Sequence, residues 1–287
     1  MPDNMAVTEA PPGSAPAMST NLKLRIVSGA ALALTAFAFA YAGTLSFALL
    51  VATVALFVSW EWGRIVRGVG ADLAFYVHAV ALLLAIILAA AGYAALGVAV
   101  LVTAAIILVP LQFGRGGRLS ALGVFYSGLP AVALIWLRSS ESYGLAAVLF
   151  IFAVVWSSDI AAYAAGRLIG GAKLWPSISP NKTWAGLMGA LCAGAVAGAI
   201  AALMLTDASV VRLSAIGLVL SFIAQAGDLG ESALKRVFGR KDASDLIPGH
   251  GGFMDRMDSI VAVATAGALF ALAVGPHAPA RALLFGL

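Results

Sequence analysis

Long runs of apolar residues, separated by short groups of glycine, proline or charged residues, recur along almost the whole chain. A helix needs about 20 mainly apolar residues to cross the hydrocarbon core of a bilayer. The runs are continuous rather than alternating, which indicates helices and not the strands of a β-barrel. The pattern therefore predicts an all-α, polytopic membrane protein. Nine runs are candidates for spans, at roughly 26–42, 44–61, 73–91, 93–112, 121–137, 143–165, 184–205, 211–230 and 259–276.

The composition agrees with this prediction. Hydrophobic residues make up 62% of the chain and charged residues 10%, and the mean hydropathy is +1.01. Soluble domains carry about 25% charged residues, so a soluble enzyme, a disordered chain and a fibrous protein are excluded. Residues 1–22 differ, because they are polar and rich in Pro, Ala and Ser, and we expect a disordered N-terminal tail there. Further spans follow the first apolar run, so we expect a retained first span rather than a cleaved signal peptide.

Small residues dominate the seventh run, in which the single cysteine, Cys192, also lies. Glycine and alanine let membrane helices approach closely. One cysteine forms neither an intrachain disulfide nor a thiolate metal cluster. We interpret Cys192 and its neighbours as packing residues.

Basic residues are concentrated in every second loop. Because positive charge favours the cytoplasmic side, the N-terminus is predicted to be cytoplasmic and the C-terminus external, with the protein in the inner membrane. The formal charge of +4 then reflects topology and contact with anionic lipid, not binding of nucleic acid. The basic loops contain Lys23 and Arg25; Arg64 and Arg67; Arg115 and Arg118; Arg167, Lys173 and Lys182; and Lys235, Arg236, Arg240, Lys241 and Arg256. The other loops and the tail contain Arg138, Arg212 and Arg281.

Charge is unevenly distributed between the halves of the chain. Residues 156–258 hold 17 of the 30 charged side chains. We therefore predict that residues 23–140 form a scaffold of transmembrane helices and that residues 141–287 form the catalytic region with its cytoplasmic loops.

The first candidate group begins with Asp159, a carboxylate inside an apolar run. An ionised group in hydrocarbon costs several kcal/mol unless it is paired or faces water. Asp159 and Tyr163 share a helix face, and Arg167 continues toward the cytoplasmic end. We interpret the group as one that positions a substrate or ion. The alternative is that Asp159 pairs with a basic residue and only fastens helices together.

The second group is Ser179, Lys182 and Thr183, at the predicted start of the seventh span. Pro180 suits the beginning of a helix, and the amides of a helix N-terminus attract phosphate. A lysine beside hydroxyl groups suits the same ligand. The alternative is that Lys182 and Trp184 are ordinary anchors at the membrane interface.

The third group is Asp228, Glu231 and Lys235, which lie on one face of a helix end. Two carboxylates at this spacing can share a hard cation such as Mg²⁺. The alternative is an ion pair between Glu231 and Lys235 on a solvated surface.

The fourth group mixes acids, bases and glycines just before the ninth span. Glycines let the backbone approach a ligand, and their amides suit phosphate. The alternative is a charged loop with a glycine turn. The group contains Arg240, Lys241, Asp242, Asp245, His250, Gly251, Gly252, Asp255, Arg256 and Asp258.

These groups together provide carboxylates for one or two divalent metal ions and basic residues for phosphates, at a membrane boundary. The sequence contains no Walker-type glycine loop and no convincing Ser-His-Asp set. The residues thus predict metal-assisted chemistry on a phosphate, with a lipid as one substrate.

The run 232–258 closely resembles the signature of the phosphatidate cytidylyltransferase (CDP-diacylglycerol synthase) family. Trp60-Glu61-Trp62, the Asp159 segment, the Ser179–Trp184 segment and Asp228-x-x-Glu231 are similar to that family as well. Many members have Glu after the Trp of the Ser-Pro-x-Lys-Thr-Trp segment, where this chain has Ala185, so a carboxylate function at that position is doubtful. The signature residues are Ser232, Lys235, Arg236, Lys241, Asp242, Pro248, His250, Gly251, Gly252, Asp255, Arg256 and Asp258.

The resemblance implies that phosphatidic acid attacks the α-phosphorus of CTP, with Mg²⁺ as cofactor and possibly a second cation. It implies a homodimer as well. It places metal on Asp228 and Asp255, with Asp258 and Glu231 as further ligands. Lys182, Lys235, Arg236 and Lys241 would neutralise the phosphates, and Ser179 and Thr183 would donate hydrogen bonds to them. The further substrate-binding residues would be Asp159, Tyr163, Arg167, Ser232, His250, Gly251, Gly252 and Arg256.

Positioning and charge stabilisation account for most of the catalysis of phosphoryl-type transfer, so no general base is assigned and His250 is interpreted as orienting. The nearest alternatives are a CDP-archaeol synthase or a polyprenol kinase. A secondary transporter that uses Asp159 is a remote alternative.

Overall fold

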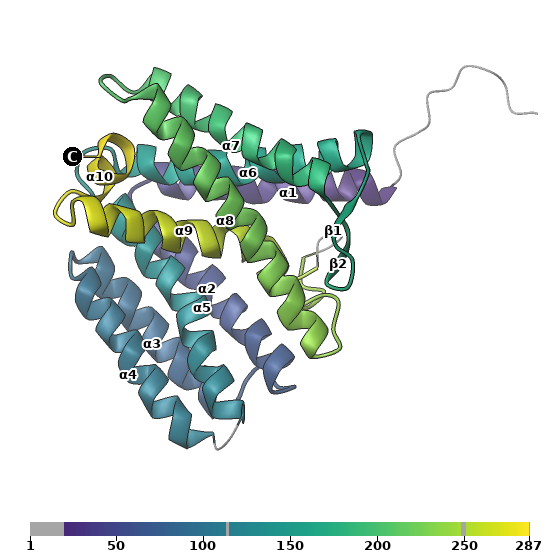
Figure 1. Ribbon diagram of the computed structural model, residues 1–287. Coiled ribbons are helices and arrows are strands. Elements are labelled where there is room, and N and C mark those ends of the chain that lie inside the picture. Colours follow the sequence, from purple (N-terminus) through teal and green to yellow (C-terminus); the bar gives the residue numbers. More distant parts are fainter. Residues whose placement is uncertain (1–19, 113–114, 248–250, 287) are drawn as a thin grey trace, which may run out of the picture.

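The structure is a computed structural model, and it describes residues 20–112, 115–247 and 251–286 (Figure 1). It is predominantly helical, as the apolar runs predict. The helices are α1 (Thr20–Tyr41), α2 (Thr44–Val66), α3 (Leu73–Ala90), α4 (Ala94–Leu111), α5 (Arg115–Arg138), α6 (Gly144–Leu168), α7 (Trp184–Met204), α8 (Val210–Val237), α9 (Met254–Val274) and α10 (Pro279–Phe285). Two short strands, β1 (Lys173–Trp175) and β2 (Ser179–Thr183), form an antiparallel hairpin between α6 and α7.

Eight of these helices, α2 to α9, are long and apolar enough to cross a bilayer. The first predicted span corresponds to α1, whose described apolar part, Val27–Tyr41, is shorter. This helix begins at Thr20, inside the segment expected to be a disordered tail; residues 1–19 of that segment lie outside the described residues. The hairpin and α10 were not expected from the hydropathy pattern, because neither is an apolar run of spanning length.

Helix α9 lies at the centre of the arrangement, between two groups of helices (Figure 1). Helices α2 to α5 pack against one another on one side, and α6, α7 and α8 pack together on the other. Helix α9 contacts α8, α6, α5 and α2. Its first turn is therefore the place where both groups of helices can contribute side chains.

Glycines allow the close packing of α7 against α8, as the small-residue pattern predicts. A Cβ atom on Gly194 would lie 2.6 Å from the carbonyl oxygen of Gly217, and one on Gly198 would lie 2.1 Å from that of Leu213. No larger residue fits at this distance without a shift of the backbone. Glycine at these positions lets α8 lie close against α7. This packing sets the position of the polar C-terminal half of α8.

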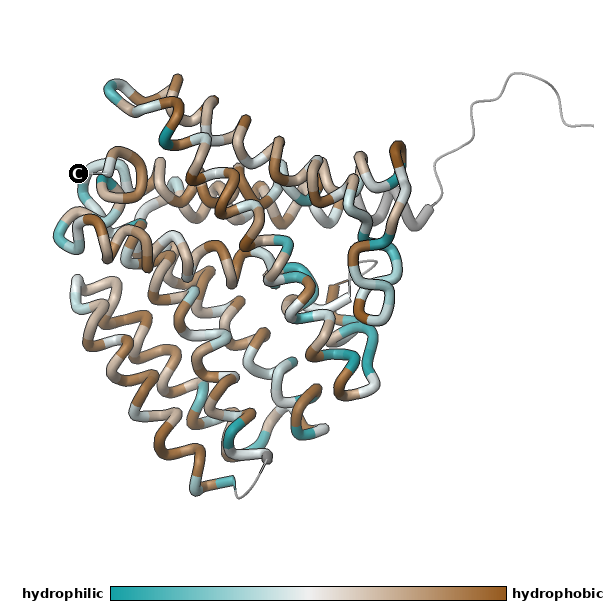
Figure 2. Tube along the Cα trace, viewed as in Figure 1, coloured by the Kyte–Doolittle hydropathy of each residue, from teal (hydrophilic) through white to brown (hydrophobic). Residues whose placement is uncertain are grey.

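Polar residues gather at one end of the molecule, around the hairpin, the C-terminal half of α8 and the start of α9 (Figure 2). The loop from α2 to α3 also carries charge, on Arg67 and Asp72. The Arg67 side chain donates two hydrogen bonds to the Asp72 carboxylate. Burial opposes the charge of Asp72, but these bonds and the Phe75 amide outweigh it and hold the pKa of Asp72 below its ordinary value.

Candidate active site

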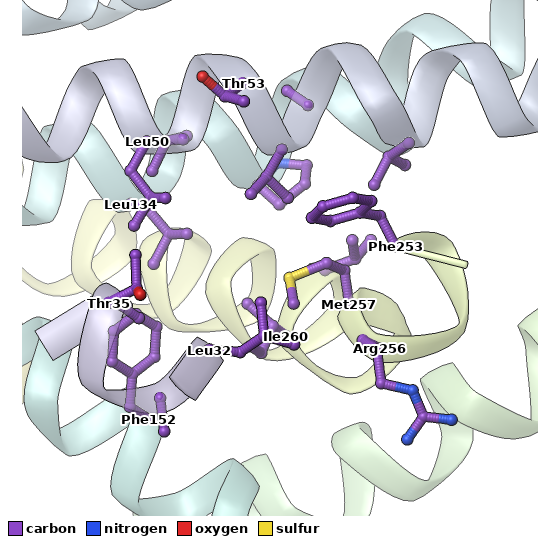
Figure 3. Close-up of a pocket in the computed structure, with 18 of the residues that line it drawn as sticks. Leu32, Thr35, Leu50, Thr53, Leu134, Phe152, Phe253, Arg256, Met257 and Ile260 are labelled. Carbon is purple, nitrogen blue, oxygen red and sulfur yellow. The ribbon is translucent and has the colours of Figure 1, made fainter. Parts of the chain in front are cut away.

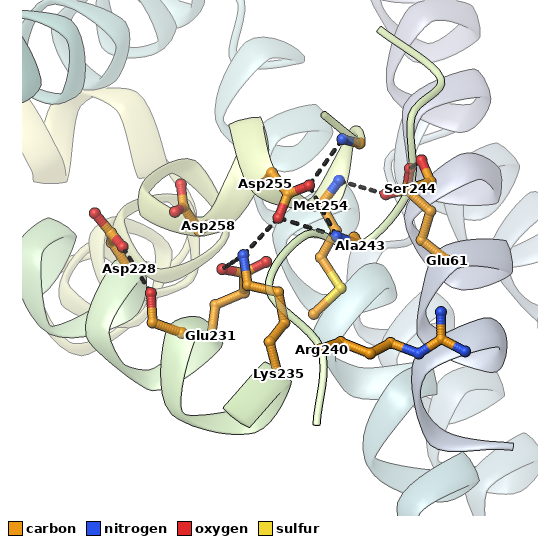
Figure 4. Close-up of polar contacts among 12 residues, drawn as sticks. Glu61, Asp228, Glu231, Lys235, Arg240, Ala243, Ser244, Met254, Asp255 and Asp258 are labelled. Carbon is orange, nitrogen blue, oxygen red and sulfur yellow. Dashed lines mark hydrogen bonds and ion pairs between the residues drawn. The ribbon is translucent and has the colours of Figure 1, made fainter. Parts of the chain in front are cut away.

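Four predicted carboxylates and Lys235 come together where α8, α9 and the loop between them meet (Figure 4). Asp228 and Glu231 lie on the C-terminal half of α8, and Asp255 and Asp258 lie in the first turns of α9. The chain from 238 to 247 and from 251 to 253 passes beside them. Residues separated by nearly thirty positions thus form one cluster.

Lys235 lies at the centre of this cluster, between two carboxylates. Its ammonium nitrogen is 2.8 Å from Oε2 of Glu231 and donates a hydrogen bond to Oδ1 of Asp255. Lys235 is 7% exposed and Glu231 3%. The alternative of a solvated ion pair between Glu231 and Lys235 is therefore wrong: the pair exists, but it is buried. Removing one partner of a buried pair leaves the other charge uncompensated, at a cost of about 3–5 kcal/mol.

Backbone amides hold the carboxylate of Asp255 from the other side. Oδ2 accepts hydrogen bonds from the amides of Ala243, at 2.9 Å, and Gly252, at 2.8 Å. Gly251, beside this contact, has a φ of +79°, and a Cβ atom there would lie 2.8 Å from Oδ2 of Asp255. Both facts require glycine. The glycine-rich loop therefore folds around a carboxylate of the cluster.

The hairpin brings a second lysine to the cluster. Nζ of Lys182, on β2, lies 2.8 Å from Oδ2 of Asp228 and donates to the carbonyl oxygen of Gln225. The Thr183 side chain is buried, and its hydroxyl oxygen accepts from the Gly186 amide and caps α7. Pro180 lies within β2, so its expected place at a helix start is wrong: the cap is Thr183 and the helix begins at Trp184.

Helices α8 and α9 lie close together at Gly227, beside Asp228 and Asp258. A Cβ atom on Gly227 would lie 3.0 Å from the carbonyl oxygen of Asp258 and 2.6 Å from Cβ of Ala262. Figure 4 shows Asp228 and Asp258 projecting from facing helices.

This donor set matches the chemistry of a hard divalent cation, which prefers oxygen ligands. Oε1 of Glu231 is buried and has no hydrogen-bond partner among the residues that the structure describes. Lys182 and Lys235 pair with three of the four carboxylates. Among the side chains that the structure describes, no three acidic, histidine or cysteine residues are arranged as a ready-made metal cluster. A cation held by Asp228 or Asp255 would lie beside a carboxylate that a lysine already contacts.

Asp159 connects three helices at the edge of this cluster. Its Oδ1 accepts hydrogen bonds from the side-chain amide of Gln225 on α8 and the hydroxyl of Ser259 on α9, each at 3.4 Å. It also lines the large cavity between α1, α2, α5, α6 and α9. The Asp159 carboxylate therefore lies between the cluster and the apolar cavity.

Several predicted site residues lie at the margin of the cluster. Tyr163 and Arg167 are exposed and hydrogen-bonded to each other at 3.5 Å. Lys241 is exposed, and Arg236 donates to the carbonyl oxygens of Ile178 and Arg240.

Of the others, Ser232 donates to Oδ1 of Asp228 at 3.4 Å. Ser179 is half-buried in β2, and Arg256 is exposed beside the cavity. Pro248 and His250 lie outside the described residues, so the orienting function of His250 stays a prediction.

Glu61, on α2, contacts the loop between α8 and α9 and the first residue of α9, although the sequence pattern predicted no function for it. It is fully buried and accepts hydrogen bonds from the amides of Phe253 and Met254, at 3.0 and 2.6 Å, and from the hydroxyl of Ser244. It therefore holds the start of α9, where Asp255 lies. The available signal was a carboxylate inside an apolar span, which is rarely without function.

The chain is similar to a known family of proteins. The cytidylyltransferase family profile matches residues 23–274. The phosphatidate cytidylyltransferase of Brucella suis biovar 1 (strain 1330) is 37% identical over 259 residues, which cover 88% of this chain and 95% of that protein. The enzyme of the same name from Bacillus subtilis (strain 168) is 41% identical over 143 residues, or 50% of this chain and 53% of that protein.

Proposed function

This chain belongs to the cytidylyltransferase family, and we propose that it transfers the cytidylyl group of CTP to phosphatidic acid, forming CDP-diacylglycerol and diphosphate. The observation that carries this function is the near full-length similarity to the Brucella phosphatidate cytidylyltransferase. The cluster of carboxylates and lysines at the membrane-spanning helices supplies the matching chemistry. The chain is thus a multi-pass membrane nucleotidyltransferase of phospholipid biosynthesis.

The reaction requires little covalent chemistry from the protein. An oxygen of the lipid phosphate forms a bond to the α-phosphorus of CTP. The bond from that phosphorus to the oxygen that bridges it to the β-phosphorus breaks, and its electron pair leaves with diphosphate. The lipid phosphate is already anionic, so no side chain has to remove a proton from it. Positioning and compensation of negative charge are the main requirements.

The basic side chains of the cluster meet the second requirement. Lys182 and Lys235 pair with carboxylates in this structure, and each can exchange a carboxylate for a phosphate oxygen. Arg236 and Lys241 are exposed at the same end of the molecule, where they would meet the triphosphate and the leaving diphosphate. Arg256 lines the cavity and would meet the lipid phosphate.

We propose Mg²⁺ as the cofactor. Asp228 and Asp255 would hold it, with Asp258 and Glu231 as further ligands. The all-oxygen donor set and the unpaired buried oxygen of Glu231 support this assignment. When bound, Mg²⁺ would neutralise charge on the triphosphate and polarise its α-phosphate.

We also propose that the active site faces the cytoplasm, the source of CTP, as the positive-inside pattern predicts. The bacterial relatives agree with an inner-membrane location. The homodimer implied by the family resemblance stays a prediction.

The first experiment is a lipid assay on the purified protein in detergent, with phosphatidic acid, radiolabelled CTP and Mg²⁺. We expect labelled CDP-diacylglycerol from the wild type, and none in EDTA or from Asp255→Asn, which removes one charge from the cluster. Asp207→Asn is the matched control, because Asp207 is exposed in the loop between α7 and α8. Absence of labelled lipid from folded wild-type protein would reject the substrate; polyprenols and archaeal ether lipids would then be tested.

A further inference from the structure

Tyr126, on α5, has a buried hydroxyl group that the contacts of the active site leave unused. The residue as a whole is half-buried, but its hydroxyl oxygen is fully buried and has no hydrogen-bond partner within the described ranges of the chain. The phenol therefore points its polar end into the protein rather than toward lipid or water. A buried hydroxyl that makes no hydrogen bond costs free energy, so it requires an explanation.

Aromatic packing determines where the Tyr126 ring lies. The ring centroids of Tyr126 and Trp62, on α2, are 5.0 Å apart, with an interplanar angle of 34°. Trp62 is buried, and its Nε1 donates to the carbonyl oxygen of Leu119 on α5, at 2.9 Å. Gly123 permits this approach, because a Cβ atom there would lie 2.5 Å from Nε1 of Trp62. The two rings are thus held together between α2 and α5.

The same ring packs beside the segments that hold the carboxylates of the site. Tyr126 packs against a small buried apolar cluster, which consists of Trp62, Ile65, Ala243 and Met254. The amide of Ala243 donates a hydrogen bond to the Asp255 carboxylate, and Met254 directly precedes Asp255 in α9. Tyr126 therefore meets the active site from the side of α5.

This position differs from that of the large apolar cavity, whose volume is about 740 Å³. Leu134 of α5 lines that cavity, as do Phe253 and Met257 around the start of α9 (Figure 3). Tyr126 is not among the residues that line it. Its hydroxyl group is therefore available to a polar ligand and not to a hydrocarbon chain.

A second buried atom of the site also lacks a partner. Glu231 is 3% exposed, and its Oε1 accepts no hydrogen bond from the described part of the chain. The Tyr126 hydroxyl can donate and the Glu231 oxygen can only accept, yet the two are not bonded to each other. A ligand that offers an acceptor to the hydroxyl and positive charge to the carboxylate would satisfy both. A phosphate group with its Mg²⁺ ion has this chemistry.

We propose that Tyr126 is a further residue of the active site and that its hydroxyl group donates a hydrogen bond to a phosphate oxygen of a bound substrate. The proposal rests on the proposed function and adds a neutral donor to the lysines. Because Trp62 and the apolar cluster already hold the ring, the donor is in place before the substrate binds, which is the condition for effective charge stabilisation. A residue of the segment 23–140, predicted as scaffold, then contacts the substrate.

The test is Tyr126→Phe, which removes the hydroxyl group and keeps the ring. The substrate-free protein loses no hydrogen bond, so we expect an unchanged or higher melting temperature in detergent. We expect kcat/KM to fall about tenfold or more, which is the effect of losing one hydrogen bond to a charged group. Tyr76→Phe is the matched control and should keep wild-type values, because Tyr76 is 60% exposed on α3 and lies outside the apolar cluster.

Equilibrium binding of radiolabelled CTP, measured with Mg²⁺ and without lipid, identifies the phosphate that Tyr126 contacts. CTP binding weakened about tenfold in Tyr126→Phe would assign the contact to the triphosphate. Wild-type CTP binding together with a raised KM for phosphatidic acid would assign it to the lipid phosphate. A fall in kcat alone would assign it to the transition state.

Two results would overturn the proposal. One is wild-type kcat/KM in Tyr126→Phe. The other is a lower melting temperature that accompanies the loss of activity, because the hydroxyl group would then stabilise the fold. Turnover by the wild type is measured first: its absence would reject the proposed function itself, whereas a fully active Tyr126→Phe would reject only the assignment of Tyr126.

Discussion

At the residue scale, the buried charges of the cluster are held by partners on α8, on α9 and in the loop between them. Lys235 connects Glu231 and Asp255, and the loop amides of Ala243 and Gly252 complete the shell of Asp255. A charge inside a membrane protein needs such partners, because hydrocarbon supplies none. These contacts hold several carboxylates close together, which is the arrangement that a cation and a triphosphate can use.

Glu61 provides the clearest test at this scale. In Glu61→Gln, one acceptor oxygen becomes an N–H donor that faces either the amide of Met254 or the amide of Phe253 and the hydroxyl of Ser244. A buried unsatisfied group costs about 1–3 kcal/mol, and the start of α9 would shift. We expect kcat to fall about tenfold or more and the melting temperature in detergent to drop.

Glu141→Gln is the control for this change, because Glu141 is exposed in the loop between α5 and α6. Steady-state kinetics and thermal unfolding of both variants are the measurements. Wild-type kcat in Glu61→Gln would show that the hydrogen bonds of Glu61 are not needed to position the start of α9.

At the scale of the elements, the site depends on how closely α8 and α9 approach. In Gly227→Ala the new methyl group would lie 2.6 Å from Cβ of Ala262, so the helices must separate. Overpacking of this kind costs about 1–3 kcal/mol. We expect activity to fall, because Asp228 and Asp258 would no longer keep their spacing.

Gly230→Ala is a matched control on the same helix, since a Cβ atom there meets nothing within 4 Å. Alanine favours the helix by about 1 kcal/mol over glycine, so this variant should be at least as stable as the wild type and active. Equal activity in the two variants would contradict a requirement for close approach at Gly227.

At the scale of the whole molecule, the loops separate into two ends. Arg138 donates to the carbonyl oxygen of Ala40, and Arg212 donates to that of Ala282, which brings the weakly charged loops together. At the other end, Arg236 contacts Ile178, and Arg67 contacts Ser120. Each of these four contacts thus joins segments that the charge pattern assigns to the same side of the membrane.

This separation predicts the outcome of cysteine labelling in intact bacterial cells. In a Cys192→Ser background, Glu141→Cys should react with a membrane-impermeant maleimide from outside. Asp245→Cys should react only after permeabilisation, since the active-site end is expected to face the cytoplasm. Both residues are exposed. The reverse labelling pattern would invert the proposed orientation.

The amino-acid sequence by itself determined the class of fold and the chemical groups of the site. The apolar runs predicted nine spans, and the structure confirms eight of them as helices long enough to cross a bilayer. The prediction works because the hydrocarbon core imposes one length and one hydrogen-bonding rule on every span. Local spacing also placed Asp228, Glu231 and Lys235 on one helix face, since residues three and four apart on a helix are neighbours.

The tertiary structure alone decided which of these groups meet. Glu61 and Met254 are separated by 193 positions, and no periodic pattern encodes a contact of that range. The hairpin that carries Lys182 to Asp228 and the cavity between five helices arise in the same way. Local periodicity states which face of a helix is polar, whereas helix packing determines which faces are opposed, because that depends on the fit of many side chains at once.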